Sequence, residues 1–143
     1  MAISEQLSSG KRVGDIITYI QHPGINYVSG KLVGAAGQAS VDANLVGQSV
    51  KASGANYIFV LAADIANALG ILAHDGPLTL AAAAVTDRPY KILLRGDAIV
   101  DKDALPATDV VAGAINNANF VTALAARGII AQSEPTKVNT QTT

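Results

Sequence analysis

The chain has 143 residues, of which half are apolar and only 4% are aromatic, and 10 Lys and Arg nearly balance 11 Asp and Glu. Without cysteine it forms no disulfide and supplies no thiolate to zinc or to nucleophilic catalysis. The cations are scattered singly, which argues against nucleic-acid binding, and no apolar run reaches the ~18 residues of a membrane span. The length predicts one domain. The acid-containing start MAISEQLSSGKR also predicts that the protein is used without a secretion signal.

Residues 1–28 are polar and only weakly periodic. We expect an exposed N-terminal arm here, with one short extended piece around residues 15–20, that becomes ordered against a partner. The folded domain is predicted to span residues 29–132, and residues 133–143 to form a loose polar tail.

Between residues 30 and 54, glycines separate short apolar pairs, which is typical of short strands and loops. The next stretch, from residue 57 to residue 105, carries the strongest pattern in the chain, because apolar runs alternate there with compact turns. The expected strands are 57–63, a second from Ile71, 78–85 and 90–100, and the expected turns are 64–69, 74–77, 86–89 and 101–106. Gly96 falls inside the last strand, where a glycine marks a bulge or a close backbone approach.

One convincing helix is predicted near the C-terminus. Asn117 or Asn119 can cap it, Phe120 and Leu124 share one face, and Gly128 suits the position after its end. A closing strand follows at 129–131. Several short strands with one late helix predict an α+β fold that is mostly β.

Two groups of residues could carry chemistry, and each has a plainer interpretation. His74 and Asp75 could form a base and its orienting partner, but adjacent residues in a Gly-Pro turn rarely converge, so a solvated turn is favoured. Asp97, Asp101 and Asp103 could bind a metal ion in a small enzyme, although their spacing does not match a calcium loop and favours turns.

Arg95-Gly96-Asp97 forms a tripeptide that is adhesive in other proteins, and it could serve a surface adhesion or ligand-binding module. The alanines at 81–84 permit two readings, a segment packed in the monomer core or a contact between subunits.

Four segments together resemble the head decoration proteins of tailed bacteriophages, the lambda-type capsid cement proteins. They are GANYIFVLAAD (54–64), ALGILA (68–73), YKILLRGDAIV (90–100) and ALAARGII (123–130). The resemblance spans roughly residues 47–131 and lies in the order and character of the segments.

This resemblance implies a compact fold of the β-tulip or β-clip kind with one C-terminal helix and an extended N-terminal arm. It further implies a homotrimer without enzymatic activity, cofactor or metal, made in the host cytoplasm and placed on the outer surface of the virion capsid. There the trimer would bind the major capsid protein at three-fold and quasi-three-fold sites. The arm side chains expected to contact the capsid are Ile16, Ile17, Tyr19 and Ile20.

Overall fold

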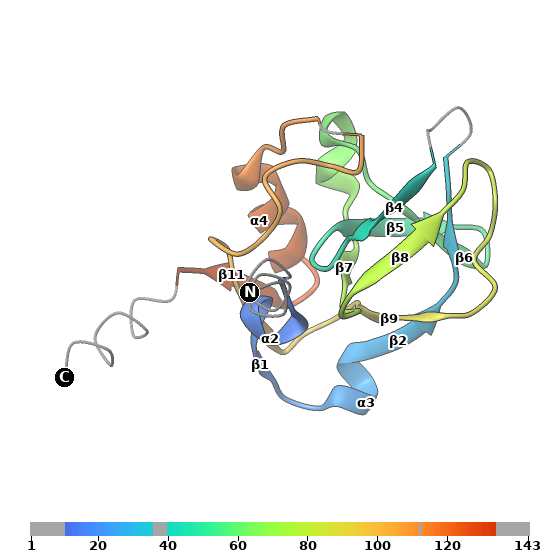
Figure 1. Ribbon diagram of the computed structural model, residues 1–143. Coiled ribbons are helices and arrows are strands. Elements are labelled where there is room, and N and C mark those ends of the chain that lie inside the picture. The colour runs from blue at the N-terminus through green and yellow to red at the C-terminus, as the bar shows by residue number, and fades with distance from the viewer. Residues whose placement is uncertain (1–10, 36–39, 112, 134–143) are drawn as a thin grey trace, which may run out of the picture.

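The computed structural model of the chain describes residues 11–35, 40–111 and 113–133 (Figure 1). The strands are β1 (Ile17–Ile20), β2 (Tyr27–Gly30), β3 (Leu32–Val33), β4 (Val41–Asn44), β5 (Ser49–Ser53), β6 (Asn56–Phe59), β7 (Gly70–Leu72), β8 (Pro77–Leu80), β9 (Tyr90–Leu93), β10 (Ala98–Asp101) and β11 (Ile129–Gln132). The helices are α2 (Val13–Ile16), α3 (Pro23–Asn26), the 3-10 segment η1 (Ala62–Asn67) and α4 (Asn117–Ala125). Strands outweigh helices, which confirms the predicted α+β, mostly β class.

The strands form three sheets. A three-stranded sheet has the order β1-β10-β11, a six-stranded sheet has the order β2-β9-β7-β5-β6-β3, and β4 pairs with β8 alone. In Figure 1, α4 lies at one side of the molecule together with η1 and β11, while β4, β8 and β6 lie at the other. Among the described residues, none of the helices has the length and apolar character to cross a membrane.

Two apolar clusters hold these sheets. One packs α4 and α2 against the three-stranded sheet, and Ile16, Val100 and Leu124 are completely buried in it. The other lies around the six-stranded sheet and β8, and Leu32, Val50 and Ile92 are completely buried there. Both are built mainly from aliphatic side chains, and each also contains one buried phenylalanine, Phe120 in the first cluster and Phe59 in the second.

Helix α4 forms for the predicted reasons, with its cap shifted by one residue. The Asn116 side chain accepts hydrogen bonds from the backbone N–H groups of Ala118 and Asn119. Phe120 and Leu124 lie four residues apart and are both buried. Gly128 then adopts a φ of 81° just beyond the helix, and the chain enters the predicted closing strand β11.

The prediction of one continuous strand over residues 90–100 is wrong, because the chain leaves one sheet and joins another within this range. β9 ends at Leu93 in the six-stranded sheet, and β10 starts at Ala98 in the three-stranded sheet. Asn26 is buried at this crossing, and its side-chain N–H₂ donates to the carbonyl oxygen of Arg95 at 2.8 Å. The resulting connection lets one continuous segment link both sheets.

The expected arm boundary at residue 28 is also corrected. Residues 13–28 belong to the folded domain, because β1 pairs with β10 and β2 pairs with β9. Ile16 has no exposed surface. The polar composition of this segment predicts an arm, but the buried Ile16 and the half-buried Ile17 and Ile20 anchor it to the core. Residues 1–10 of the arm and 134–143 of the tail lie outside the described residues.

Candidate interaction surfaces

The outer face of the three-stranded sheet carries a row of large apolar side chains. Tyr19 of β1 pairs with Ile99 of β10, and Ile99 in turn pairs with Ile130 of β11. Tyr19 is 49% exposed and Ile130 is 46% exposed. Side chains in register on one face of a sheet are direct neighbours. These three residues therefore form a continuous feature, which we call the outer apolar row.

A β-bulge in β1 produces this arrangement. The register shifts between Ile17, which pairs with Val100, and Tyr19. Strict alternation would place Ile17 and Tyr19 on the same face, but the extra residue, Thr18, lets Tyr19 point outward while Ile17 packs against the core. The Thr18 hydroxyl donates to the carbonyl oxygen of Ile99 at 3.1 Å. No glycine or proline marks the bulge, so no local feature of the sequence predicts it.

The four side chains expected to contact a capsid are thus divided between two environments. Ile16 is buried in the core, and Ile17 and Ile20 are half-buried against it. Ile16 is consequently not available to a partner. Of the four, Tyr19 has the exposure that a contact requires.

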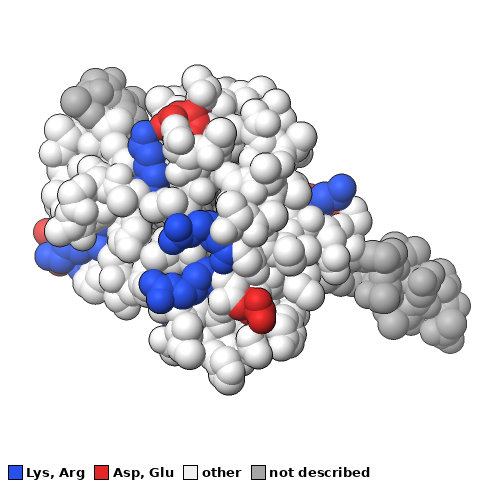
Figure 2. Space-filling view, turned by 180° about the vertical axis from the view of Figure 1, so that it is seen from behind, with Lys and Arg blue, Asp and Glu red and all other residues white. Residues whose placement is uncertain are grey.

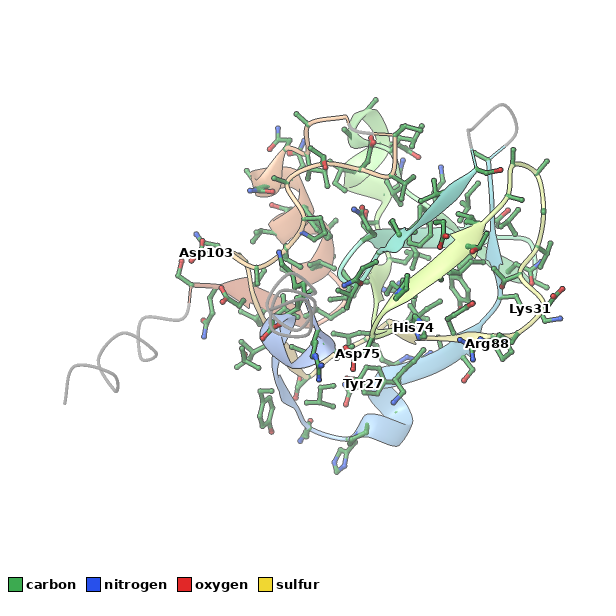
Figure 3. The ribbon with its side chains drawn as sticks, in the orientation of Figure 1. Tyr27, Lys31, His74, Asp75, Arg88 and Asp103 are labelled. Carbon is green, nitrogen blue, oxygen red and sulfur yellow. The ribbon has the colours of Figure 1, made fainter. Side chains whose placement is uncertain are left out.

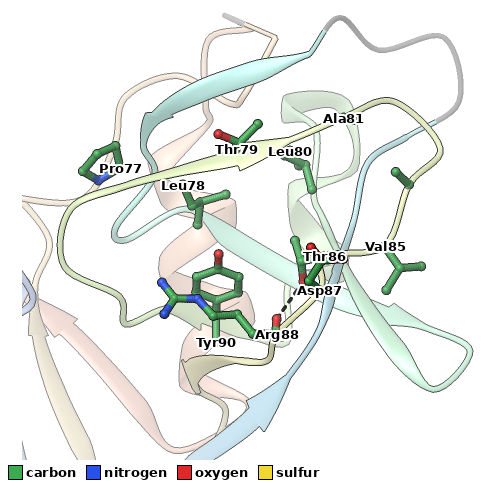
Figure 4. Close-up of a pocket in the computed structure, with 11 residues that line it drawn as sticks. Pro77, Leu78, Thr79, Leu80, Ala81, Val85, Thr86, Asp87, Arg88 and Tyr90 are labelled. Atoms are coloured by element: carbon green, nitrogen blue, oxygen red, sulfur yellow. Dashed lines mark hydrogen bonds between the residues drawn. The ribbon is translucent and has the colours of Figure 1, made fainter.

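A second surface feature is a pocket beside β8 (Figure 4). It has a volume of about 490 Å³ and lies between β8 and the returning residues 84–90. Leu78 points from β8 toward the ring of Tyr90, and the Arg88 guanidinium carbon lies 5.0 Å from the centre of that ring. The pocket therefore combines an aliphatic and aromatic lining with one cation, Arg88, and one acidic residue, Asp87.

His74 and Asp75 adjoin this pocket but do not act as a pair (Figure 3). The His74 ring packs edge-on against Tyr90, with ring centres 4.8 Å apart. Burial lowers the pKa of His74, and the positive charge of Arg88 lowers it further, although Asp75 opposes both. Asp75 instead accepts the backbone N–H of Val13 at 2.7 Å. Its role is to fasten the start of α2 to the turn before β8.

The acidic residues Asp97, Asp101 and Asp103 do not converge on a common point. Asp101 is buried and accepts the backbone N–H of Asp103 at 3.0 Å, which is the geometry of a turn. No cluster of three or more metal-ligating side chains exists among the described residues.

The tripeptide Arg95-Gly96-Asp97 lies in the connection between β9 and β10, outside both strands. Arg95 and Asp97 are exposed. The Gly96 N–H donates to the carbonyl oxygen of Arg127 at 2.9 Å, and a Cβ atom on Gly96 would collide with the backbone of Gly128. Close backbone approach, one of the two predicted reasons for a glycine here, explains its presence.

The alanines at 81–84 form a turn on the surface. Ala81, Ala82 and Ala83 are exposed, so packing in the monomer core is wrong for them. The turn is fixed to Gly34, whose N–H donates to Ala84 and whose carbonyl oxygen accepts from Ala83, both at 2.9 Å. The alternative reading as a subunit contact stays a prediction.

Basic side chains gather near the middle of the face opposite to that of Figure 1, where acidic side chains are sparse (Figure 2). Arg95 and Arg127 are exposed, and Gly96, the residue after Arg95, donates its N–H to the carbonyl oxygen of Arg127. Lys91 is exposed as well, and its Nζ atom lies 4.9 Å from the centre of the Tyr27 ring. Burial raises the pKa of that tyrosine, and the charge of Asp75 raises it further.

Asp109 is a buried charge that sequence reasoning missed. Its carboxylate accepts the backbone N–H groups of Ala62 at 2.6 Å, Gly113 at 2.8 Å and Val111 at 2.9 Å. Burial alone would raise its pKa, but these backbone donors outweigh burial and lower it. Asp109 therefore connects the loop before α4 to η1 through these hydrogen bonds, which is a structural role. A lone Asp in a loop sequence gives no signal of this.

Comparisons with known proteins give no relative. No family model, curated protein or solved structure matches this chain.

Proposed function

We propose that this protein is a homotrimeric capsid decoration protein of a tailed bacteriophage. In this role it binds the major capsid protein on the outer surface of the expanded head and stabilises the shell against the pressure of packaged DNA. The proposal starts from the four sequence segments that resemble the decoration family. The β-tulip or β-clip architecture is part of the same proposal.

The observation that supports it best is the outer apolar row. A contiguous exposed apolar feature on a small protein is typical of a surface that another polypeptide covers. Tyr19 is well suited to such a contact, because a tyrosine combines a large apolar ring with a polar hydroxyl. The row is also small, as expected for a contact that is repeated on each subunit.

Repetition explains how a small contact suffices. When one subunit of a trimer has bound, the other two bind as if at a high local concentration, so the overall affinity rises by about 10²- to 10⁴-fold. A trimer that lies across a local three-fold axis of a shell would use this effect directly. Each subunit then needs only a weak contact.

The test combines solution mass with binding to shells. Light scattering should give three chain masses, and the trimer should co-sediment to saturation with expanded, undecorated capsids. A Tyr19→Ser, Ile130→Ser double variant should remain folded and lose this co-sedimentation. Ile25→Ser, which changes a side chain 59% exposed on α3 away from the row, is the matched control and should bind normally. A wild-type monomer that ignores the shells would overturn the proposal.

Adhesion through Arg95-Gly96-Asp97 is the alternative function. The exposure of Arg95 and Asp97 favours it, whereas the close packing of Gly96 on Gly128 holds the tripeptide against the body of the protein. Asp97→Ala should abolish attachment to cells if adhesion is the function. Attachment that survives this change would remove the alternative.

A further inference from the structure

Strand β8 has an open edge, and Pro77 shows which backbone groups face it. In an antiparallel ladder, pairs that exchange two hydrogen bonds alternate with pairs that exchange none. Asn44 pairs with Pro77, and proline has no N–H, so this pair exchanges none. The exchanging pairs are therefore Ala43 with Leu78 and Val41 with Leu80, the next alternate positions.

It follows that the N–H and carbonyl groups of Thr79 point away from β4. Within the described residues, β8 pairs with β4 alone, and the backbone of Thr79 makes no other hydrogen bond. Thr79 lines the pocket of Figure 4 and its side chain is exposed. One donor and one acceptor are thus presented at the open edge of β8.

The opposite wall of the pocket is formed by residues 84–90. Tyr90 and Leu78 form its apolar floor (Figure 4). The volume of about 490 Å³ lies within the ~300–1,000 Å³ that ligand pockets occupy. An unpaired strand edge above an apolar floor is the geometry that proteins use to bind an extended peptide as an added strand.

Two charged residues, Asp87 and Arg88, line this pocket, and they form no salt bridge with each other. The Arg88 guanidinium lies over the Tyr90 ring, and in the described part of the chain the single salt bridge joins Lys51 to Asp64 elsewhere. The cation at the pocket consequently has no carboxylate partner among these residues. An incoming carboxylate would supply one.

We propose that this pocket, which we call the β8 slot, binds an extended segment of another polypeptide in which an aliphatic and an acidic residue lie two positions apart. In the bound peptide, the side chain of the residue that pairs with Thr79 points to the same outward face as the Thr79 side chain. The peptide residues before and after it point inward, to the side of Leu78 and Leu80. One of these two side chains contacts the apolar floor, and the other contacts Arg88. Alternation along a strand therefore sets the spacing. The inference does not depend on the proposed capsid function.

A peptide titration of the full chain tests the slot. The probe is acetyl-Thr-Val-Thr-Glu-Thr-amide, together with the same peptide in reversed order because the strand direction is open. One control peptide carries Gln in place of Glu, and a second carries an N-methyl group on its central residue, which blocks backbone pairing. Binding is followed by the amide shifts of the protein in ¹⁵N–¹H NMR spectra.

We expect the Thr79 amide to exchange rapidly with solvent in the free protein and to show the largest shift on addition of one Glu peptide. The N-methylated peptide should cause no such shift. Arg88→Gln should weaken binding of the Glu peptide by about fivefold, as for a partly exposed charge pair, and leave the Gln peptide unaffected. Arg95→Gln, which removes an exposed cation elsewhere, should change neither affinity.

Three results would overturn the proposal. The first is a Thr79 amide that is already protected in the free full-length chain, because another segment would then occupy the edge. The second is equal binding of the N-methylated peptide, which would exclude strand addition without reliance on any protein variant. The third is the absence of a Thr79 shift with all peptides.

Discussion

Asp109 allows the sharpest test of the described fold. Asp109→Asn keeps the shape of the side chain but replaces one carboxylate oxygen with an N–H₂ group, so the amide cannot accept all three backbone N–H groups of Ala62, Val111 and Gly113. A hydrogen bond to a charged group contributes about 1.5–3 kcal/mol, and an orphaned buried donor adds a desolvation cost of about 1–3 kcal/mol. Asp109 is only 5% exposed, so solvent screens it little. We expect the free energy of unfolding to fall by about 2–4 kcal/mol.

The pH dependence follows from the lowered pKa of Asp109. Because the pKa of the folded state lies below the unfolded value of about 3.9, the stabilisation is complete above that value. It is lost as the pH falls through the folded-state pKa. Asp109→Asn should therefore unfold at lower urea concentration at pH 7 and should show a shallower loss of stability between about pH 5 and pH 3.

Urea unfolding followed by circular dichroism measures both effects. Asp103→Asn is the matched control, since Asp103 is exposed and is expected to change stability by less than about 0.5 kcal/mol. The reasoning would be refuted if Asp109→Asn were as stable as this control at pH 7, or if both variants lost stability equally on acidification.

Three further predictions concern the core, the histidine and the N-terminal segment. Leu124→Ala leaves a cavity at a completely buried position and should cost about 2–5 kcal/mol in urea unfolding, whereas Ala125→Ser on the exposed face of the same helix should cost far less. Since the folded-state pKa of His74 is lowered, stability should decline as the pH falls below about 6.5, and His74→Gln should flatten that decline between pH 7.5 and 5.5 in thermal unfolding. Deletion of residues 1–28 removes Ile16, β1 and half of β2, so the shortened chain should lose its cooperative unfolding transition. A normally folded product in calorimetry would contradict the observed pairing.

The elements that the sequence predicted well depend on local chemistry. Helix α4 is defined by four residues that lie within a few turns of one another, Asn116, Phe120, Leu124 and Gly128. These local features indicate a helix independently of the rest of the chain. The short strands between residues 30 and 54 follow in the same way from the spacing of glycines.

The elements that it missed depend on residues distant in sequence. The break after β9 requires Asn26 at one side and Gly128 at the other, and neither is near residues 94–97 in the chain. Ile16 is buried because β10 lies beside it, which a local pattern cannot reveal. The β8 slot likewise arises because residues 84–90 return past β8 without pairing with it.

The position of β1 has a consequence for synthesis on the ribosome. Ile17 pairs with Val100, so β1 has no partner in its sheet until β10 has left the ribosome, and β11 completes that sheet later still. The hairpin of β5 and β6, in contrast, can form as soon as it emerges, because Ser53 pairs with Asn56. Throughout elongation, Ile16 and Tyr19 would then be exposed on an unfinished chain. During synthesis β1 is thus open to chaperones for longer than the hairpin of β5 and β6.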